Sequence, residues 1–453
     1  MEDVKRPWEK LVDLMEANQP DQVKAYLHSM NSEDIVRSMS RLEKKEQLSL
    51  LTLLHPEDAA DLLEDMHEYH AADIMEEMEA GKAAAIFNEL DSDEQADILT
   101  EMEDEEAQAI ISQMEPDEAE SVRKLIQYDA DTAGGMMITE FLSFDDKLTV
   151  GHVVKELREN AEEYEDYNLQ YIYATSADKL QGVLQMRDLL LSTPDTQLDK
   201  IVHPDVISVK DTATLRDLIN FVDDYDFYGV PVLDDHGVLL GVVLRRDILE
   251  AKSEQANIEL LETQGIVGGE ELRTMPVWLR SKRRLSWLTV NILLNVLAAS
   301  VIAFHQDTLS SIIALAVFLP IISDMSGCSG NQAVAVSLRE LSLGVIRPFE
   351  AMRVWWQEAS VGLINGIVLG VLIGGVAYLW KGSMVLSLIV GGALMLNTLV
   401  AVSIGGTIPL ILRKFGADPA LASGHILTTI TDMFGFFLTL TFASIALAQF
   451  GGI

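Results

Sequence analysis

The chain has 453 residues, with 33 Lys/Arg against 71 Asp/Glu and a formal net charge of −38. Residues 280–453 hold 10 of the Lys/Arg and 7 of the Asp/Glu, so residues 1–279 carry 23 and 64, a net charge of −41. A part this acidic repels nucleic acid and anionic lipid and attracts cations, which argues against a nucleic-acid partner and indicates divalent cations.

Residues 59–126 contain an internal repeat with a period of 12, whose eight-residue units start at 59, 71, 83, 95, 107 and 119. Apolar residues occupy the fourth and eighth places of each unit, which predicts one face of a short helix. Stacked helices of this kind bury their apolar faces together in a solenoid, which we predict for residues 1–130. We interpret the acidic junctions at 91–94, 103–106 and 115–118 as N-caps and solvated turns.

Two similar stretches follow, "LQYIYATSADKLQGVLQMRDLLL" and "YGVPVLDDHGVLLGVVLRRDILE". Each reads as a strand, a turn, a second strand and a helix opened by Asp188 or Asp247. The pattern resembles a pair of CBS modules, here over residues 131–252. The resemblance implies an adenosine nucleotide such as ATP in the cleft of the pair, with Arg187 and Asp188 as candidate contacts.

Five long, charge-poor runs come after a polar segment, residues 253–279, that we predict to be a connecting helix. Runs of this length and composition predict transmembrane helices, here within residues 280–453. Lys and Arg concentrate before the first run and in the second and fourth connections, so the positive-inside rule places the acidic part in the cytosol and the C-terminus outside. We therefore predict a multi-pass protein of the cytoplasmic (inner) membrane. The runs are Leu285–Phe304, Thr308–Leu338, Ala359–Trp380, Gly382–Leu412 and Pro419–Ile453.

Asp432 carries the one Asp, Glu, Lys or Arg charge of the last run. An ionised carboxylate in hydrocarbon costs roughly 3 kcal/mol on insertion scales. None of the five runs contains Lys or Arg, and His425, seven residues earlier and on the same helix face, is the other titratable residue of this run. Asp432 is then either a buried structural carboxylate or, as we favour, a group that faces a water-filled path and attracts a cation.

The second run contains "LPIISDMSGCSGNQAVAVS", in which Pro320, Gly327 and Gly330 are predicted to interrupt or thin the helix and expose carbonyl groups. The other oxygen ligands of this run are Asp324, Asn331 and Gln332. Oxygen ligands at a constriction suit hard cations such as Mg²⁺, which keeps most of its waters. Because the chain lacks a Gly-rich loop ending in Gly-Lys-Ser/Thr, we expect no nucleotide-hydrolysing enzyme.

The order of these parts, together with "GNQ", "ADPALASG" and "TTITDMFG", resembles the MgtE family of magnesium channels. The resemblance implies a homodimer in membrane lipid whose pore is lined by the second and fifth spans. It further implies that Asp432 holds a hydrated Mg²⁺ and that Asp418 lies at the cytosolic mouth. The expected fold class is a polytopic α-helical membrane protein with a cytosolic helical solenoid and an α/β tandem CBS domain.

Three positions depart from the family's pattern. Cys328 in "SGCSG" stands where an Asn is expected, Asp324 replaces a common Gly, and His425 replaces a common Pro. A thiolate favours Zn²⁺ or Co²⁺ over Mg²⁺, so a broader divalent channel for Co²⁺, Mn²⁺ or Zn²⁺ is an open alternative. A neutral, buried Cys328 that binds no metal is the other interpretation.

The resemblance also implies regulation, because Mg²⁺ bound to the cytosolic part of the family closes the pore through the connecting helix. An acidic pair that the family carries is missing here, where Thr214 and Arg216 stand. The main hypothesis is a channel that imports Mg²⁺ and is gated by cytosolic Mg²⁺, and the alternative from another class is a membrane-anchored nucleotide sensor. The candidate regulatory ligands are Asp91, Asp226 and Asp247, which match the family's acidic sites, and Glu250, Glu254 and Glu259 on or beside the connecting helix.

Overall fold

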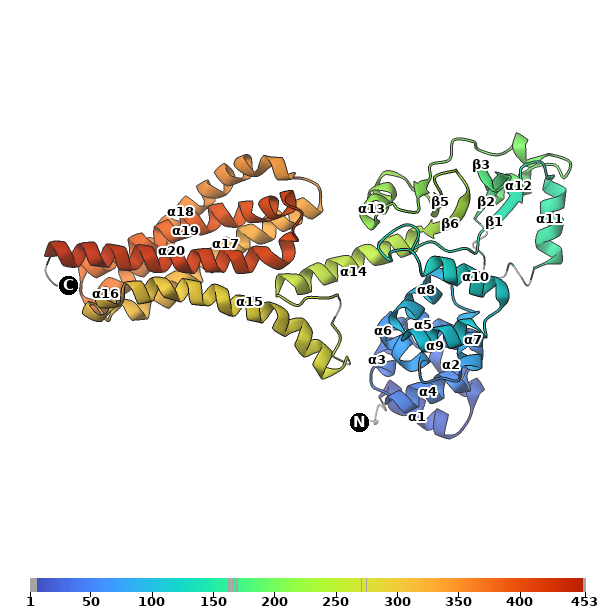
Figure 1. Ribbon diagram of the computed structural model, residues 1–453, viewed down its shortest axis with the longest axis horizontal. Helices are drawn as coiled ribbons and strands as arrows, with labels where there is room; N and C mark the ends of the chain where they lie inside the picture. Colours follow the sequence, from blue (N-terminus) through green and yellow to red (C-terminus); the bar gives the residue numbers. More distant parts are fainter. Residues whose placement is uncertain are drawn as a thin grey trace. The chain divides into compact units, whose positions relative to one another are not determined.

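The computed structural model describes residues 6–161, 164, 167, 170–269, 271–273 and 275–450. The chain divides into two compact units, Met1–Glu254 and Gln255–Ile453 (Figure 1). The boundary between them falls inside one helix, α14 (Arg245–Thr263).

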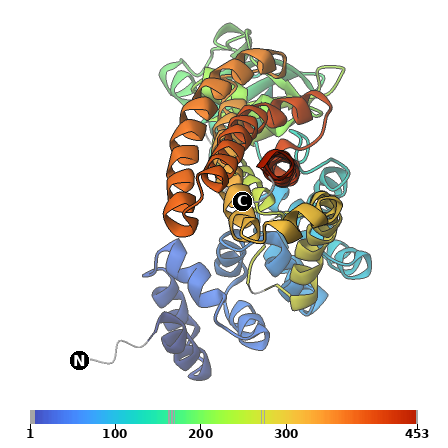
Figure 2. The same ribbon diagram turned by 90° about the vertical axis from the view of Figure 1, so that its left-hand side faces the viewer.

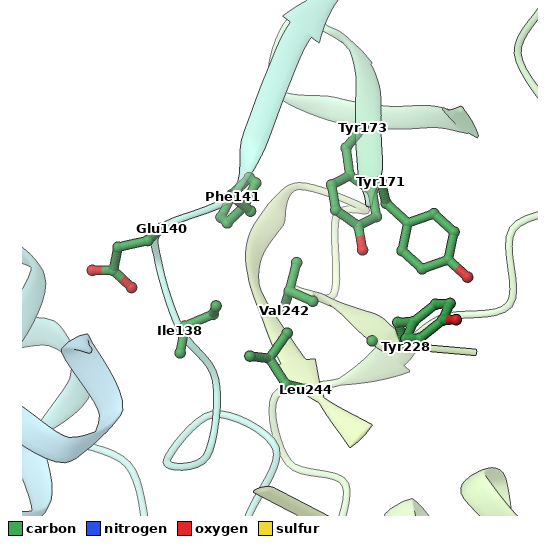
Figure 3. A pocket seen from close by; sticks show the side chains of 9 residues that line it. Ile138, Glu140, Phe141, Tyr171, Tyr173, Tyr228, Val242 and Leu244 are labelled. Atoms are coloured by element: carbon green, nitrogen blue, oxygen red, sulfur yellow. The ribbon is translucent and has the colours of Figure 1, made fainter. Parts of the chain in front are cut away.

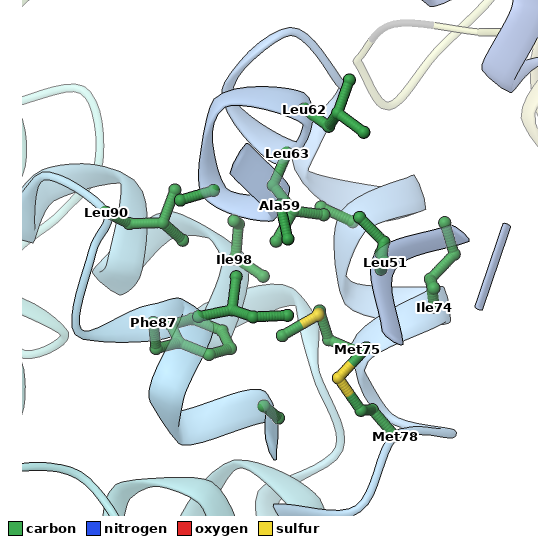
Figure 4. Packing of buried hydrophobic residues seen from close by; sticks show 14 of the residues in the cluster. Leu51, Ala59, Leu62, Leu63, Ile74, Met75, Met78, Phe87, Leu90 and Ile98 are labelled. Atoms are coloured by element: carbon green, nitrogen blue, oxygen red, sulfur yellow. The ribbon is translucent and has the colours of Figure 1, made fainter. Parts of the chain in front are cut away.

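From residue 6 onward, where the structure describes the chain, the first unit opens with ten short helices. Helices α5 to α10 begin at Pro56, Glu68, Ala80, Ser92, Asp104 and Pro116, so the predicted period of 12 residues is confirmed. The fourth place of each repeat unit is a buried aliphatic residue, from Leu62 at 3% exposed to Val122 at 0%. All six belong to one buried apolar cluster, in which Figure 4 shows Ile98 beside Met75 and Phe87. The helices are α1 (Pro7–Glu16), α2 (Pro20–Leu27), α3 (Ser32–Met39), α4 (Lys44–Leu53), α5 (Pro56–Glu64), α6 (Glu68–Met75), α7 (Ala80–Phe87), α8 (Ser92–Glu101), α9 (Asp104–Ile111) and α10 (Pro116–Leu125).

The acidic junctions agree only in part with their interpretation as N-caps and solvated turns. Asp91, Glu103 and Glu115 do occupy the N-cap positions of α8, α9 and α10, but none of their side chains accepts a capping hydrogen bond. The turn at 91–94 is also not solvated, because Ser92 and Asp93 are 0% and 8% exposed. The Ser92 hydroxyl donates to Glu140 Oε2 at 2.9 Å, which fixes this turn against the chain that leads into the next module.

In the described part of the following region, the chain forms two three-stranded sheets of the same topology, as the duplicated sequence pattern predicts. In each sheet the first strand pairs parallel with the second, and the second pairs antiparallel with the third. Both antiparallel pairs have a register shift after the fourth residue of the middle strand, at Ala174 and Val232. The elements are β1 (Leu142–Asp145), α11 (Val150–Glu159), β2 (Tyr171–Ser176), β3 (Lys179–Gln185) and α12 (Met186–Leu191) in the first module, and β4 (Val209–Lys210), α13 (Leu215–Asp224), β5 (Gly229–Leu233), β6 (Leu239–Leu244) and α14 in the second.

The predicted connecting helix over 253–279 is wrong at both ends. Helix α14 starts directly after β6 at Arg245 and continues to Thr263, so the last helix of the second module and the connector are one element. Gly265 has φ +78° in the left-handed region that favours glycine, and a Cβ there would lie 2.5 Å from Trp287 Cδ1. The described residues between 264 and 276 are not helical.

The second unit is a bundle of long helices: α15 (Val277–Phe304), the short α16 (Gln306–Ser311), α17 (Leu315–Ser342), α18 (Ala351–Lys381), α19 (Met384–Lys414) and α20 (Pro419–Phe450). Helix α19 packs against α17, α18 and α20, and α15 packs against α20 (Figures 1 and 2). Among the described residues, α15, α18, α19 and α20 are long and apolar enough to cross a membrane. Helix α17, which contains the second predicted span, has the same length as α15 but is not in that group. A total of five membrane spans therefore stays a prediction.

The predicted break in the second span is also wrong, because α17 runs without interruption through Pro320, Gly327 and Gly330. Proline is tolerated inside membrane helices where neighbours compensate for the lost hydrogen bond. Gly330 instead permits close packing, since a Cβ there would lie 2.9 Å from the carbonyl oxygen of Ala401 on α19. The close approach of the α17 and α19 backbones therefore explains why position 330 is a glycine, and an exposed carbonyl group is not needed to explain it.

The packing of α18 on α19 gives a test of this bundle. A Cβ on Gly366 would lie 2.5 Å from the carbonyl oxygen of Met395, whereas a Cβ on Gly375 of the same helix meets nothing within 4 Å. Overpacking a tight contact costs roughly 1–3 kcal/mol. We expect Gly366→Val to lower the melting temperature of the purified protein and the yield of its monodisperse form. Gly375→Val, the matched control, should leave both unchanged, and equal melting temperatures for the two variants would refute this packing.

Candidate cation-binding sites

Asp432 lies half-buried on α20, and its Oδ1 accepts a hydrogen bond from the Ser323 hydroxyl of α17. The neighbouring turn of α20 is fixed from the other side, because Asn397 Nδ2 of α19 donates to the Thr431 carbonyl oxygen at 3.0 Å. Gly435 leaves room for this amide, since a Cβ there would lie 2.6 Å from Nδ2. Contacts with α19 therefore set the rotation of α20 that directs Asp432 toward α17.

Neither Ser323 nor Asn397 was a sequence candidate, and Ser323 could have been suspected only as the neighbour of Asp324. Among the described residues, the structure gives Asp432 a hydroxyl partner and no basic one, which agrees with the lack of Lys and Arg in the five charge-poor runs. His425 packs edge-on against Trp287 of α15, with ring centroids 5.4 Å apart.

The predicted ligands of α17 occupy one exposed helix face. Asp324, Cys328, Asn331 and Gln332 are all exposed in the single chain, whereas Ser326, Gly327, Ser329 and Gly330 are buried on the opposite side. The interpretation of Cys328 as a buried cysteine is therefore wrong for this chain. Within the described residues, no group of three or more His, Cys, Asp or Glu side chains is positioned to hold a metal ion, so one chain does not gather these ligands into a chelating set.

A second acidic site forms where the end of α14 meets the end of α17 and the residue directly before α20. Asp418 precedes α20, and its Oδ1 accepts a hydrogen bond from Ala420 N at 2.6 Å. Burial and a hydrogen bond with the Asp418 carboxyl raise the pKa of Glu262 to about 7. Glu259 Oε2 accepts a hydrogen bond from the Ser342 hydroxyl at the end of α17, at 3.4 Å. Glu262 was missed, although its spacing of three residues from Glu259 puts both on one helix face.

A third acidic site joins α8 to the start of α14. The Arg246 guanidinium donates to Asp91 and, through Nε, to Asp247 Oδ1 at 3.0 Å. Burial together with neighbouring carboxylates raises the pKa of Asp247 to about 6, of Glu64 to about 7 and of Glu94 to about 8. The structure thus brings the predicted Asp91 and Asp247 together.

The remaining regulatory candidates lie outside this third site. Asp226 is fully exposed and pairs with Arg245 at 3.3 Å, and Glu250 is exposed. Glu254 lies near Asp97, where burial and neighbouring carboxylates, Glu68 foremost, raise the pKa of Asp97 to about 7.

A cleft opens between the two α/β modules (Figure 3). The Tyr171 and Tyr228 rings lie at one end with centroids 6.3 Å apart, and Phe141 contacts Tyr173 edge-on. Its free volume is about 20 Å³, far below the several hundred Å³ of an ordinary ligand pocket. Arg187 and Asp188 are not among its lining residues; their side chains lie 3.6 Å apart, and Asp188 also contacts His203. The lining is completed by Ile138, Glu140, Gly229, Val242 and Leu244.

Comparison with known proteins first defines the class, because residues 319–442 match the family described as a divalent cation transporter, MgtE. Residues 30–131 match the MgtE intracellular N domain and residues 198–254 match the CBS domain. The chain is 32% identical over 313 residues to the magnesium transporter MgtE of Bacillus subtilis, covering 69% of each chain. It is 30% identical over 331 residues to the magnesium transporter MgtE of Thermus thermophilus, covering 72% of each.

The chain therefore belongs to the MgtE family, and the resemblance inferred from its motifs is confirmed. A solved structure of the cytosolic domain of the Mg²⁺ channel MgtE in complex with ATP is 27% identical, with a TM-score of 0.49 over 54% of this chain and 99% of that chain.

Proposed function

We propose that this protein imports Mg²⁺ across the cytoplasmic membrane, with its acidic part in the cytosol and its C-terminus outside. The observation that carries the proposal is the Asp432 carboxylate, held between α20 and α17 by a hydroxyl and not by a base. Such a carboxylate keeps its negative charge available to a hydrated cation. The relatives named as magnesium transporters support Mg²⁺ as that cation. A transport role accounts for these features without an enzymatic activity.

The exposed polar face of α17 supports a homodimer. A carboxylate and two side-chain amides facing lipid would be costly, because the bilayer core offers them no hydrogen-bond partners. Two copies that bring these faces together would enclose Asp324, Asn331 and Gln332 around a shared water-filled path. The pore of the proposed dimer is thus lined by α17 and α20.

Flux into proteoliposomes tests the proposal directly. The purified full-length protein should carry Mg²⁺ into vesicles that enclose a fluorescent Mg²⁺ indicator, and the indicator fluorescence of protein-free vesicles should not change. Failure of every divalent cation to enter would favour the alternative in which the spans only anchor a nucleotide sensor.

The exposed Cys328 thiol favours a second candidate, a channel that also admits softer cations such as Zn²⁺, Co²⁺ or Mn²⁺. We expect Cys328→Asn to keep Mg²⁺ flux and to reduce Zn²⁺ and Co²⁺ flux severalfold, because an amide oxygen replaces a soft ligand. Flux of each ion should be compared in the same vesicles, with Cys328→Ser as a second variant that removes the thiol at similar size. Identical Zn²⁺ and Co²⁺ flux in all three proteins would place the thiol away from the ion path.

Regulation is the remaining part of the proposal. Cytosolic Mg²⁺ bound between carboxylates would stabilise a closed form if closing brings those carboxylates together, since a ligand favours the state that binds it better. The cleft between the α/β modules offers aromatic faces for an adenosine ring, and its small free volume means that a nucleotide such as ATP has to displace the Tyr171 or Tyr228 ring.

A further inference from the structure

Two consecutive arginines begin α14, where the family resemblance places ligands of regulatory ions. Arg245 Nη1 lies 3.3 Å from Asp226 Oδ1. Arg246 reaches back to α8, where its guanidinium donates to Asp91, and its Nε donates to Asp247 Oδ1. Asp91 and Arg246 are separated by 155 residues in sequence, so this contact joins the helical repeats to the second α/β module.

The residues at this site do not fit a divalent ion. Mg²⁺ requires oxygen ligands at about 2.0–2.1 Å in octahedral geometry. The guanidinium instead occupies the space between the two carboxylates and uses an oxygen of each. It also carries its own positive charge, which repels a second cation at the same place. An ion could bind between Asp91 and Asp247 only after Arg246 had left.

The guanidinium of Arg246 suits this position better than the compact charge of a lysine ammonium group would. Its planar fork presents several donors at fixed angles and stays protonated at every physiological pH. The carboxylates of Asp93, Glu64 and Glu94 lie close enough to Asp91, Asp247 or Arg246 for mutual electrostatic interaction. Without a cation between them, the negative charges of Asp91 and Asp247 would repel each other and push α8 and α14 apart.

We infer that Arg246 is a resident cation that joins the helical repeats to the second CBS module, so that this contact forms without a divalent ion. Cytosolic Mg²⁺ then acts at other carboxylates, such as those on the second half of α14. The inference deepens the proposed gating by Mg²⁺. Only the statement that Mg²⁺ acts at other carboxylates rests on that proposed function; the role of Arg246 does not.

Hydrogen–deuterium exchange of the full-length protein tests the inference, read at peptides that cover the start of α8 and the start of α14. Wild type should be protected equally with and without millimolar Mg²⁺. Arg246→Met should exchange roughly tenfold faster without Mg²⁺, as expected for losing charge-assisted hydrogen bonds. Arg246→Lys, which keeps the charge but loses the fork, should fall between the two.

Arg245→Met is the matched control, because it removes the same charge one residue away and should leave the protection of α8 intact. Asp91→Asn removes the acceptor from the other side with little change of shape, and it serves as the second variant if Arg246→Met does not fold. Protection of α8 in wild type that appears only after Mg²⁺ is added would overturn the inference, as would an Arg246→Met protein that is fully protected without Mg²⁺. Because exchange is read without transport, a protein that fails to carry Mg²⁺ leaves this test valid.

Discussion

Asp432→Asn is expected to reduce Mg²⁺ uptake by at least about a hundredfold while leaving the protein folded. Asparagine has nearly the same shape as aspartate, and its side-chain oxygen can still accept the hydrogen bond from Ser323. Only the negative charge is lost. Two unit charges about 4 Å apart attract each other by about 4 kcal/mol at an effective dielectric constant of about 20, and a divalent cation doubles the charge on one side. Even with screening by pore water, that loss exceeds the roughly 2.7 kcal/mol that corresponds to a hundredfold.

Ser323→Ala is the matched control for this prediction, since it removes the hydrogen bond but keeps the carboxylate. We expect it to retain most of the flux, with a modest loss from the less restricted orientation of Asp432. Both variants should be compared with wild type in proteoliposomes, and size-exclusion profiles should match. Near-normal Mg²⁺ flux through a well-assembled Asp432→Asn protein would mean that Asp432 is a structural carboxylate and does not bind the transported ion.

The parts of the fold that sequence predicted well are those where one repeated local pattern determines the structure. Each 12-residue unit of the solenoid places one aliphatic residue at the same buried position, from Leu62 to Val122, so the helix starts follow from periodicity alone. The same holds for the two α/β modules, whose duplicated sequence pattern gives the same strand order in both sheets.

Where the prediction was wrong, an interaction distant in sequence decided the outcome. Pro320 stays within a continuous helix because α17 is packed on α19 and α20, which no local pattern reveals. The buried turn at Ser92 depends on Glu140, 48 residues later. The acidic composition indicated cations, but the cation beside Asp91 is an arginine 155 residues away. Sequence therefore identified the carboxylates and not their partners.

The carboxylates at the end of α14 lead to the second large effect. We expect Glu259→Gln combined with Glu262→Gln to give a pore that stays conductive at millimolar cytosolic Mg²⁺. Glu262 shares a hydrogen bond with Asp418, and Glu259 contacts Ser342 at the end of α17. These side chains therefore bring the connecting helix to the end of α17 and to the residue before α20, the two helices that line the proposed pore. A divalent ion that replaces the shared proton would hold the three carboxylates together and stabilise the closed form.

Amides weaken that ion site without much change in shape. A loss of about 1.4 kcal/mol per ligand raises the Mg²⁺ concentration for half-closure about tenfold, so the double variant should need roughly a hundredfold more. The pKa of Glu262, raised to about 7, sets the pH dependence. Below pH 7 this carboxyl is protonated and protons compete with Mg²⁺, so closure of the wild type should require more Mg²⁺ at pH 6 than at pH 8. The variant should lose most of that pH dependence.

Single-channel or vesicle-flux recordings across a range of cytosolic Mg²⁺ would measure both effects. The matched control is Glu103→Gln with Glu105→Gln, which removes the same charge from two exposed positions on the helical repeats. If the net charge of the cytosolic part governed closure through general repulsion, both double variants would change the Mg²⁺ response alike. A shift confined to the Glu259 and Glu262 variant indicates a specific ion site, because those side chains, unlike Glu103 and Glu105, contact Ser342 at the end of α17 and Asp418 before α20. Closure of that variant at the same Mg²⁺ concentration as wild type would mean that the end of α14 holds no gating ion.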